Sequence, residues 1–142
     1  MTTKEYLSQI SRLNRTIKNK LSEISQIREL SYSISAISSE EKVKTTLTYD
    51  KIGNTYAKID ALQHQLNQII YEYVDRKNEI IAQIDNMENE IFYDILFSRY
   101  VEQKTFERIA QDMNYSFRQI TRLHEKALKE FEKKYGATYL EK

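Results

Sequence analysis

The stretch "TFERIAQDMNYSFRQITRLHEKAL", residues 105–128, decides the fold of this chain. Two apolar helical patterns flank a polar break at residues 114–116. Ala110 is small enough for a second helix to cross closely, and Asn114 tolerates the positive φ that a tight turn requires. Thr105 and Ser116 are good N-caps for two successive helices. These features predict a helix-turn-helix.

Apolar residues around this stretch recur at helical spacing and predict a small core. We expect three helices at about 88–100, 105–112 and 116–134, with Gly136 at the C′ position that ends the last helix. Four inward side chains should close the core of the helix-turn-helix: Ile109, Met113, Ile120 and Leu123.

The preceding residues carry two long amphipathic patterns, at about 3–34 and 54–89. Ser and Thr are frequent between them, which predicts a loop at about 35–53. Two such helices most simply form an antiparallel hairpin. Because a hairpin has a thin core, we expect a third helix, from the same chain or from a partner subunit, to cover its remaining apolar edge. The hairpin would then form a homodimer or bind another protein such as RNA polymerase. The predicted fold is all-α: a coiled-coil-like hairpin at residues 1–89, then a three-helix helix-turn-helix domain at residues 90–142.

The composition excludes several classes of protein. The 142 residues include no Cys, no Pro and two Gly, which favours helices and excludes disulfides and Cys-ligated zinc. No apolar run is long enough to span a membrane and no signal peptide opens the chain, so we expect a cytoplasmic protein. No phosphate loop or nucleophile elbow is present, and we expect neither an enzyme nor a cofactor or metal. His64 and His124 are interpreted as surface residues.

Positive charge is concentrated toward the C-terminus. Residues 1–98 contain 12 Lys and Arg against 14 Asp and Glu, whereas residues 99–134 contain 9 against 6. The excess lies where a phosphate-binding surface would need it, although a solvated helix face would look the same.

The quoted stretch resembles region four of bacterial sigma factors, the part that reads the promoter −35 element. The matching residues are Thr105, Glu107, Ile109, Ala110, Met113, Ser116, Ile120, Leu123, Ala127 and Leu128. The upstream "ILFSRYVEQKT" resembles the helix and loop before this unit in that family. Nearly the whole chain resembles a family of small proteins from phages and integrated elements of Gram-positive bacteria. This resemblance implies a transcriptional regulator that binds promoter DNA. RNA polymerase is a candidate partner of the helical hairpin.

A recognition helix meets base edges with its first two turns. The base-reading window is therefore Ser116, Phe117, Arg118, Gln119, Thr121 and Arg122. Sigma factors usually have Arg-Glu-Arg, an apolar residue, Arg and Gln here, so the bases read should differ from a standard −35 element. Phe117 remains open between a DNA contact and a core or subunit contact. The expected phosphate contacts are Arg99, Lys104, Arg108, Lys126 and Lys129. The alternative for each is a solvated cation, favoured for Lys129 taken alone.

Two other functions fit the same pattern. A coiled-coil adaptor could bind RNA polymerase or a phage protein without reading DNA. A small terminase-like DNA-packaging subunit would also join a helix-turn-helix to oligomerising helices. Double-stranded DNA is the expected partner of a transcriptional regulator. The number of subunits distinguishes a packaging subunit, which would form a large ring, from the other two functions.

Overall fold

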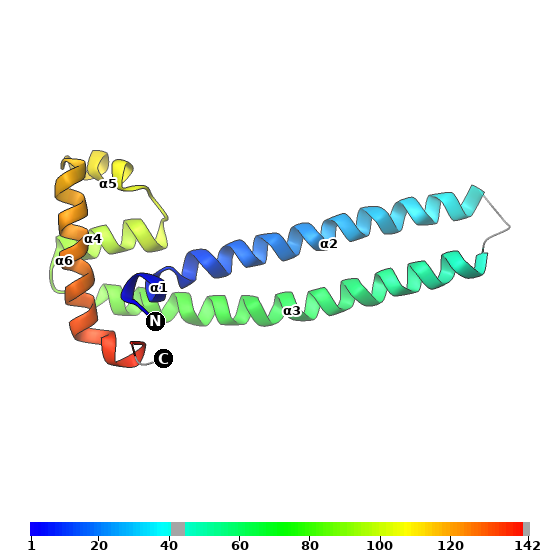
Figure 1. Ribbon diagram of the computed structural model, residues 1–142, viewed down its shortest axis with the longest axis horizontal. Helices are drawn as coiled ribbons and strands as arrows, with labels where there is room; N and C mark the ends of the chain where they lie inside the picture. Colours follow the sequence, from blue (N-terminus) through cyan, green and yellow to red (C-terminus); the bar gives the residue numbers. More distant parts are fainter. Residues whose placement is uncertain (41–44, 141–142) are drawn as a thin grey trace. The chain divides into compact units, whose positions relative to one another are not determined.

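The computed structural model describes the backbone of residues 1–40 and 45–140, and the side chains of residues 1–33 and 53–140. Its elements are α1 (Thr3–Leu7), α2 (Gln9–Glu40), α3 (Thr45–Asp85), α4 (Glu90–Leu96), the π-helix η1 (Phe97–Val101), α5 (Phe106–Met113), α6 (Phe117–Tyr135) and the 3₁₀ turn η2 (Gly136–Thr138) (Figure 1). The described ranges contain no strand, which confirms the all-α class. None of their helices combines the length and apolar character needed to cross a bilayer.

The chain forms two compact units, and α2 and α3 contribute residues to both. One unit, called here the terminal unit, joins Met1–Leu13 to Tyr73–Lys142. The other, called the helical-pair unit, is Asn14–Glu72. These limits differ from the division expected at residues 89 and 90, because the first residues of the chain pack against the C-terminal helices.

The N-terminal residues belong to the core of the terminal unit. Thr2 and Glu5 form a capping box that starts α1, and a single turn residue, Ser8, separates α1 from α2. The single helix expected from residue 3 is therefore two helices. Buried side chains from α1, α2, α3, α4, η1 and α6, and from the residue that follows η2, meet in one cluster: Tyr6, Leu7, Ile10, Ile80, Ile84, Leu96, Tyr100, Ala127, Leu128, Phe131 and Tyr139.

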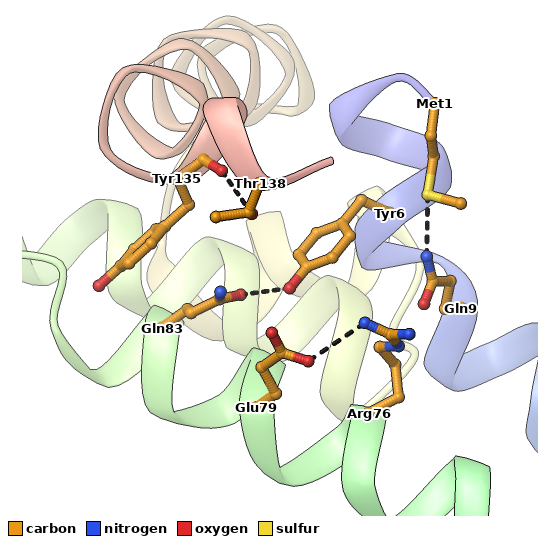
Figure 2. Close-up of polar contacts among 8 residues, drawn as sticks. All are labelled: Met1, Tyr6, Gln9, Arg76, Glu79, Gln83, Tyr135 and Thr138. Atoms are coloured by element: carbon orange, nitrogen blue, oxygen red, sulfur yellow. Dashed lines mark hydrogen bonds and ion pairs between the residues drawn. The ribbon is translucent and has the colours of Figure 1, made fainter. Parts of the chain in front are cut away.

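Tyr6 fixes α1 within this unit through its ring and its hydroxyl group. Its ring stacks on that of Tyr139, with centroids 4.2 Å apart. Its hydroxyl donates a hydrogen bond of 2.7 Å to Gln83 Oε1 on α3, as Figure 2 shows. Burial raises the pKa of the Tyr6 hydroxyl above its ordinary value, so the group stays a neutral donor at physiological pH.

Helices α2 and α3 lie side by side within the helical-pair unit (Figure 1). Ile24 of α2 packs with Ile59, Leu62 and Leu66 of α3. Helix continues through residue 40 and resumes at residue 45, so the loop expected at about 35–53 is wrong over 35–40 and 45–53. Ser and Thr lower helix stability only by about half a kcal/mol each, and no Pro interrupts the run. Residues 41–44 lie outside the described residues.

Gly136 follows α6 but does not adopt the left-handed conformation expected of a C′ glycine. Its φ of −57° and ψ of −32° are ordinary helical values, and the chain continues into η2. A Cβ at this position would lie 2.9 Å from Leu140 Cδ1. Close approach of Leu140, rather than a positive φ, is therefore what the glycine accommodates.

Candidate nucleic-acid interface

Helices α5 and α6 are joined by a turn whose ends are capped by side chains, as the sequence predicts. Thr105 Oγ1 accepts a hydrogen bond of 3.2 Å from the backbone N–H of Arg108 at the start of α5. Asn114 ends α5 in the left-handed region, with φ 59° and ψ 37°. The next N–H, of Tyr115, donates to the Ala110 carbonyl at 2.9 Å, which satisfies an otherwise orphaned helix carbonyl.

The start of α6 is fixed by a reciprocal pair of hydrogen bonds. Ser116 Oγ accepts from the backbone N–H of Gln119 at 3.1 Å, and Gln119 Oε1 accepts from the backbone N–H of Ser116 at 2.9 Å. This capping box satisfies two donors at the first turn. The oxygen atoms of both side chains are thereby engaged in starting the helix.

A small apolar cluster holds α5 against α6. Ala110 is buried at the contact, where a larger side chain would separate the two helices. The four predicted inward residues all belong to this cluster, together with residues from α4, α5 and the turn: Ile95, Phe106, Ile109, Ala110, Met113, Tyr115, Ile120 and Leu123.

The exposed face of α6 carries a stripe of four cations, called here the basic stripe. It consists of Arg118, Arg122, Lys126 and Lys129, all exposed. Their spacing of four, four and three residues places them on one side of a helix with 3.6 residues per turn. Within the part of the chain that the structure describes, no carboxylate lies within 4.0 Å of their charged nitrogens.

The remaining residues of the expected base-reading window differ in their exposure and in their contacts within the chain. Thr121 is half-buried, and its hydroxyl donates to the Arg118 carbonyl at 2.9 Å. Phe117 is 50% exposed, and its ring meets the ring of Phe106 edge-on, with centroids 6.4 Å apart. Arg118, Arg122 and Phe117 are therefore the exposed side chains of this window that lie outside the capping box.

Three of the five expected phosphate contacts lie in a separate cluster beside α5. Lys104 Nζ lies 3.1 Å from Asp112 Oδ2, and Arg108 Nε lies 3.3 Å from Asp112 Oδ1. The hydrogen bond from Lys104, with help from Arg108, lowers the pKa of the Asp112 carboxyl. Arg99 lies over the ring of Phe106, 4.3 Å from its centroid, and donates to the Lys104 carbonyl at 3.0 Å. These cations already have partners within the protein.

One cation near the basic stripe, Lys4, is not among the DNA contacts predicted from the sequence. Lys4 of α1 lines a groove of about 470 Å³ together with Arg122, Lys126 and Lys129. Its ammonium group also pairs with Glu125 at 3.4 Å. No local pattern in the sequence could reveal this position, since it depends on α1 packing against a helix more than 110 residues away.

His124 is buried, which corrects its interpretation as a surface residue. It is 2% exposed, and its Nε2 lies 2.7 Å from the hydroxyl oxygen of Tyr100. Burial, reinforced by Lys4 and Arg99 and opposed by Glu125, lowers the pKa of the imidazole to about 4. Position 124 lies four residues after Ile120 and could have been assigned to the inward face of α6 by helical spacing.

Burial also raises the pKa of the Tyr100 hydroxyl, to about 12. Tyr100 and His124 are thus a neutral, mutually bonded pair at physiological pH. His64 is exposed, as expected. Among the described residues, no group of three or more His, Asp and Glu side chains gathers as a metal ion would require.

A family model described as "Protein of unknown function (DUF1492)" matches residues 30–132 of the chain. The chain belongs to this family. The region matched to the DUF1492 family contains α4, η1, α5, the turn and all but the last three residues of α6, and thus the whole basic stripe. Lys4 lies outside the matched region. No curated protein and no solved structure matches the chain.

Proposed function

We propose that this protein is a sequence-specific DNA-binding transcriptional regulator of phage or mobile-element origin. In this proposal α5 and α6 act as a helix-turn-helix, and α6 enters the major groove. The observation that carries the proposal is the basic stripe, which starts in the first turn of α6, directly after the capped turn. A recognition helix needs its base-reading and phosphate-binding side chains in this position.

In this proposal the first two turns of α6 contact bases and the later turns contact phosphates. Arg118 and Arg122 lie in its first two turns, where a guanidinium can donate two hydrogen bonds to a guanine. Phe117 beside them can contact a thymine methyl group. Lys126 and Lys129 follow farther along the helix and would contact phosphates, with Lys4 beside them. Ser116 and Gln119, which are engaged in the capping box, would position the helix rather than read bases.

Two further observations support a DNA partner. The basic stripe has no carboxylate partner within the described chain, so a polyanion would replace only bound water and counterions. The stretch from Thr105 to Leu128 also resembles sigma region four, which implies promoter DNA as the ligand and RNA polymerase as a neighbour. Because Phe117, Arg118 and Gln119 depart from the usual sigma pattern, the proposed site differs from a standard −35 element.

A selection of bound duplexes from a random pool tests this function. The full-length chain should enrich one short motif containing guanines, at positions that Arg118 and Arg122 can reach from one face of the groove. Recovery of no motif, together with capture of purified RNA polymerase, would favour the adaptor function instead.

We also propose that the helical-pair unit pairs with a second copy of the chain. Among the side chains that the structure describes in this unit, the buried apolar cluster consists of Ile24, Ile59, Leu62 and Leu66. Large apolar side chains on the same helices are more than half exposed: Leu21, Leu30, Tyr32, Tyr56 and Tyr71. Pairing would cover such a surface. Light scattering should then give twice the chain mass of 17.0 kDa. A monomer would contradict the pairing, and a ring of many copies would favour the packaging function.

A further inference from the structure

The terminal unit contains a cavity of about 340 Å³ that the DNA-binding proposal does not use. Seven polar or charged residues from its N-terminal and C-terminal parts line it: Lys4, Ser8, Ser11, Arg99, Tyr100, Gln103 and His124. The volume falls within the range typical of small-ligand sites and would hold roughly ten waters at liquid density.

The lining is positively charged. Lys4 and Arg99 contribute two cations, and the residues that line the cavity include no carboxylate. Glu125, the ion-pair partner of Lys4, is not among them. One Arg99 nitrogen donates to the Lys104 carbonyl, but a guanidinium carries five N–H donors and can bind an anion with others. A ligand of this cavity should therefore carry negative charge.

The rest of the lining is rich in neutral hydrogen-bonding groups. Ser8 and Ser11 supply hydroxyls and Gln103 an amide, while Phe106 supplies the only wholly apolar side chain. The bonded pair of Tyr100 and His124, 7% and 2% exposed, forms a fixed part of the wall. Such a surface suits a ligand with several hydroxyl groups better than an apolar or aromatic ligand.

The backbone on one side of the cavity has unusual geometry. Phe97–Val101 is a π-helix, which in proteins is often found at functional sites. Gln103, just beyond it, has a φ of 60°, which is unfavourable for a residue other than Gly, Asn or Asp. Arg99, Tyr100 and Gln103 of this short segment all line the cavity. The irregular backbone thus directs three side chains toward one space.

We propose that this cavity binds a small phosphorylated polyol, of the chemical class of the sugar phosphates. Lys4 and Arg99 hold the phosphate, and Ser8, Ser11 and Gln103 bond to the hydroxyls. The proposal does not depend on DNA binding, because Lys4 is the only side chain that it shares with the DNA contacts proposed above, and its test contains no nucleic acid.

Isothermal titration of the full-length chain with ribose 5-phosphate, ribose and inorganic phosphate tests the proposal. Ribose 5-phosphate should bind with a dissociation constant below ~1 mM, inorganic phosphate at least about tenfold more weakly, and ribose not measurably at ~10 mM. No saturable binding of ribose 5-phosphate would overturn the proposal. Equal affinity for inorganic phosphate would overturn the role of the hydroxyls.

Variants locate the binding within the cavity. Lys4→Gln removes an exposed cation and should weaken ribose 5-phosphate binding about tenfold. Ser11→Ala, which keeps the charge, should weaken it about threefold while leaving inorganic phosphate unaffected. Lys58→Gln removes an exposed cation of the helical-pair unit and should change nothing. Unaltered ribose 5-phosphate binding in both Lys4→Gln and Ser11→Ala, with circular dichroism like that of the parent chain, would place the ligand elsewhere and contradict the proposal.

Discussion

The hydroxyl oxygen of Tyr100 and Nε2 of His124 lie 2.7 Å apart in the interior of the terminal unit. Tyr100 belongs to η1, before α5, and His124 lies in the middle of α6. Their rings are also stacked, with centroids 5.7 Å apart, and Phe106 meets the imidazole edge-on at 4.8 Å. This buried contact connects α6 to the segment preceding α5, and its protonation should affect the stability of the unit.

The free energy of unfolding should fall as the pH falls from 7 to 5. The pKa of His124 is lowered from 6.5 to about 4 in the folded chain, mainly by burial. Between these values the unfolded chain binds a proton that the folded chain does not, so stability is complete above about pH 6.5 and declines toward pH 4. The loss between pH 7 and pH 5 should be about 2 kcal/mol. Urea unfolding at the two pH values measures it.

The chain contains only one other histidine, which provides the control. His64→Gln should keep the full difference between pH 7 and pH 5, because His64 is exposed. His124→Gln should lose most of that difference, although it lowers stability at both pH values by removing the contact with Tyr100. A His124→Gln variant with an undiminished pH dependence would show that other groups cause it.

The two left-handed residues of the terminal unit should respond differently to glycine. Gln103 and Asn114 have φ values of 60° and 59°. Asn tolerates this conformation whereas Gln does so poorly, so Gln103→Gly should raise stability by up to about 1 kcal/mol. Asn114→Gly should be nearly neutral, and Asn114→Ala should destabilise by about 1 kcal/mol. Chemical denaturation of the three variants compares them directly. Destabilisation by Gln103→Gly would mean that contacts of the Gln103 side chain outweigh its backbone cost.

Removal of the side-chain cap at the start of α6 should lower the stability of the folded chain. Ser116→Ala deletes the acceptor for the Gln119 N–H and should cost about 1 kcal/mol. Ser116→Asp keeps an acceptor and should stay near the parent value, since Asp caps as well as Ser. Thermal melting followed by circular dichroism distinguishes the two variants. Equal melting temperatures for Ser116→Ala and the parent chain would show that the cap contributes little.

The structure of α5, α6 and the turn between them could be predicted from interactions between residues close in the sequence. The caps at Thr105 and Ser116, the left-handed turn at Asn114 and the small residue at Ala110 depend on neighbours within four residues, and the structure confirms each of them. Helix limits in this region agree within a few residues for the same reason. The predicted DNA contacts remain predictions, but the structure separates four cations on α6 from three that have partners beside α5.

Contacts between residues far apart in the sequence could not be predicted from local sequence patterns. Lys4 contacts α6 and Tyr6 contacts α3 across more than 70 residues of sequence, and no pattern within α1 signals these contacts. His124 was misassigned for a different reason, because polar residues are usually exposed and its partner Tyr100 lies in another helix. The loop expected between the long helices was too long because weak helix formers alone do not end a helix.

The measurement that tests DNA reading most directly is fluorescence anisotropy of a selected duplex with the full-length chain over a series of salt concentrations. The double variant Arg118→Ala/Arg122→Ala should lose at least about 2 kcal/mol of binding free energy and most of its discrimination against a mutated duplex. The matched control Arg15→Ala/Lys58→Ala removes two exposed cations of the helical-pair unit and should bind like the parent chain. Unchanged affinity, discrimination and salt dependence in the Arg118→Ala/Arg122→Ala variant would contradict the proposal that α6 reads DNA.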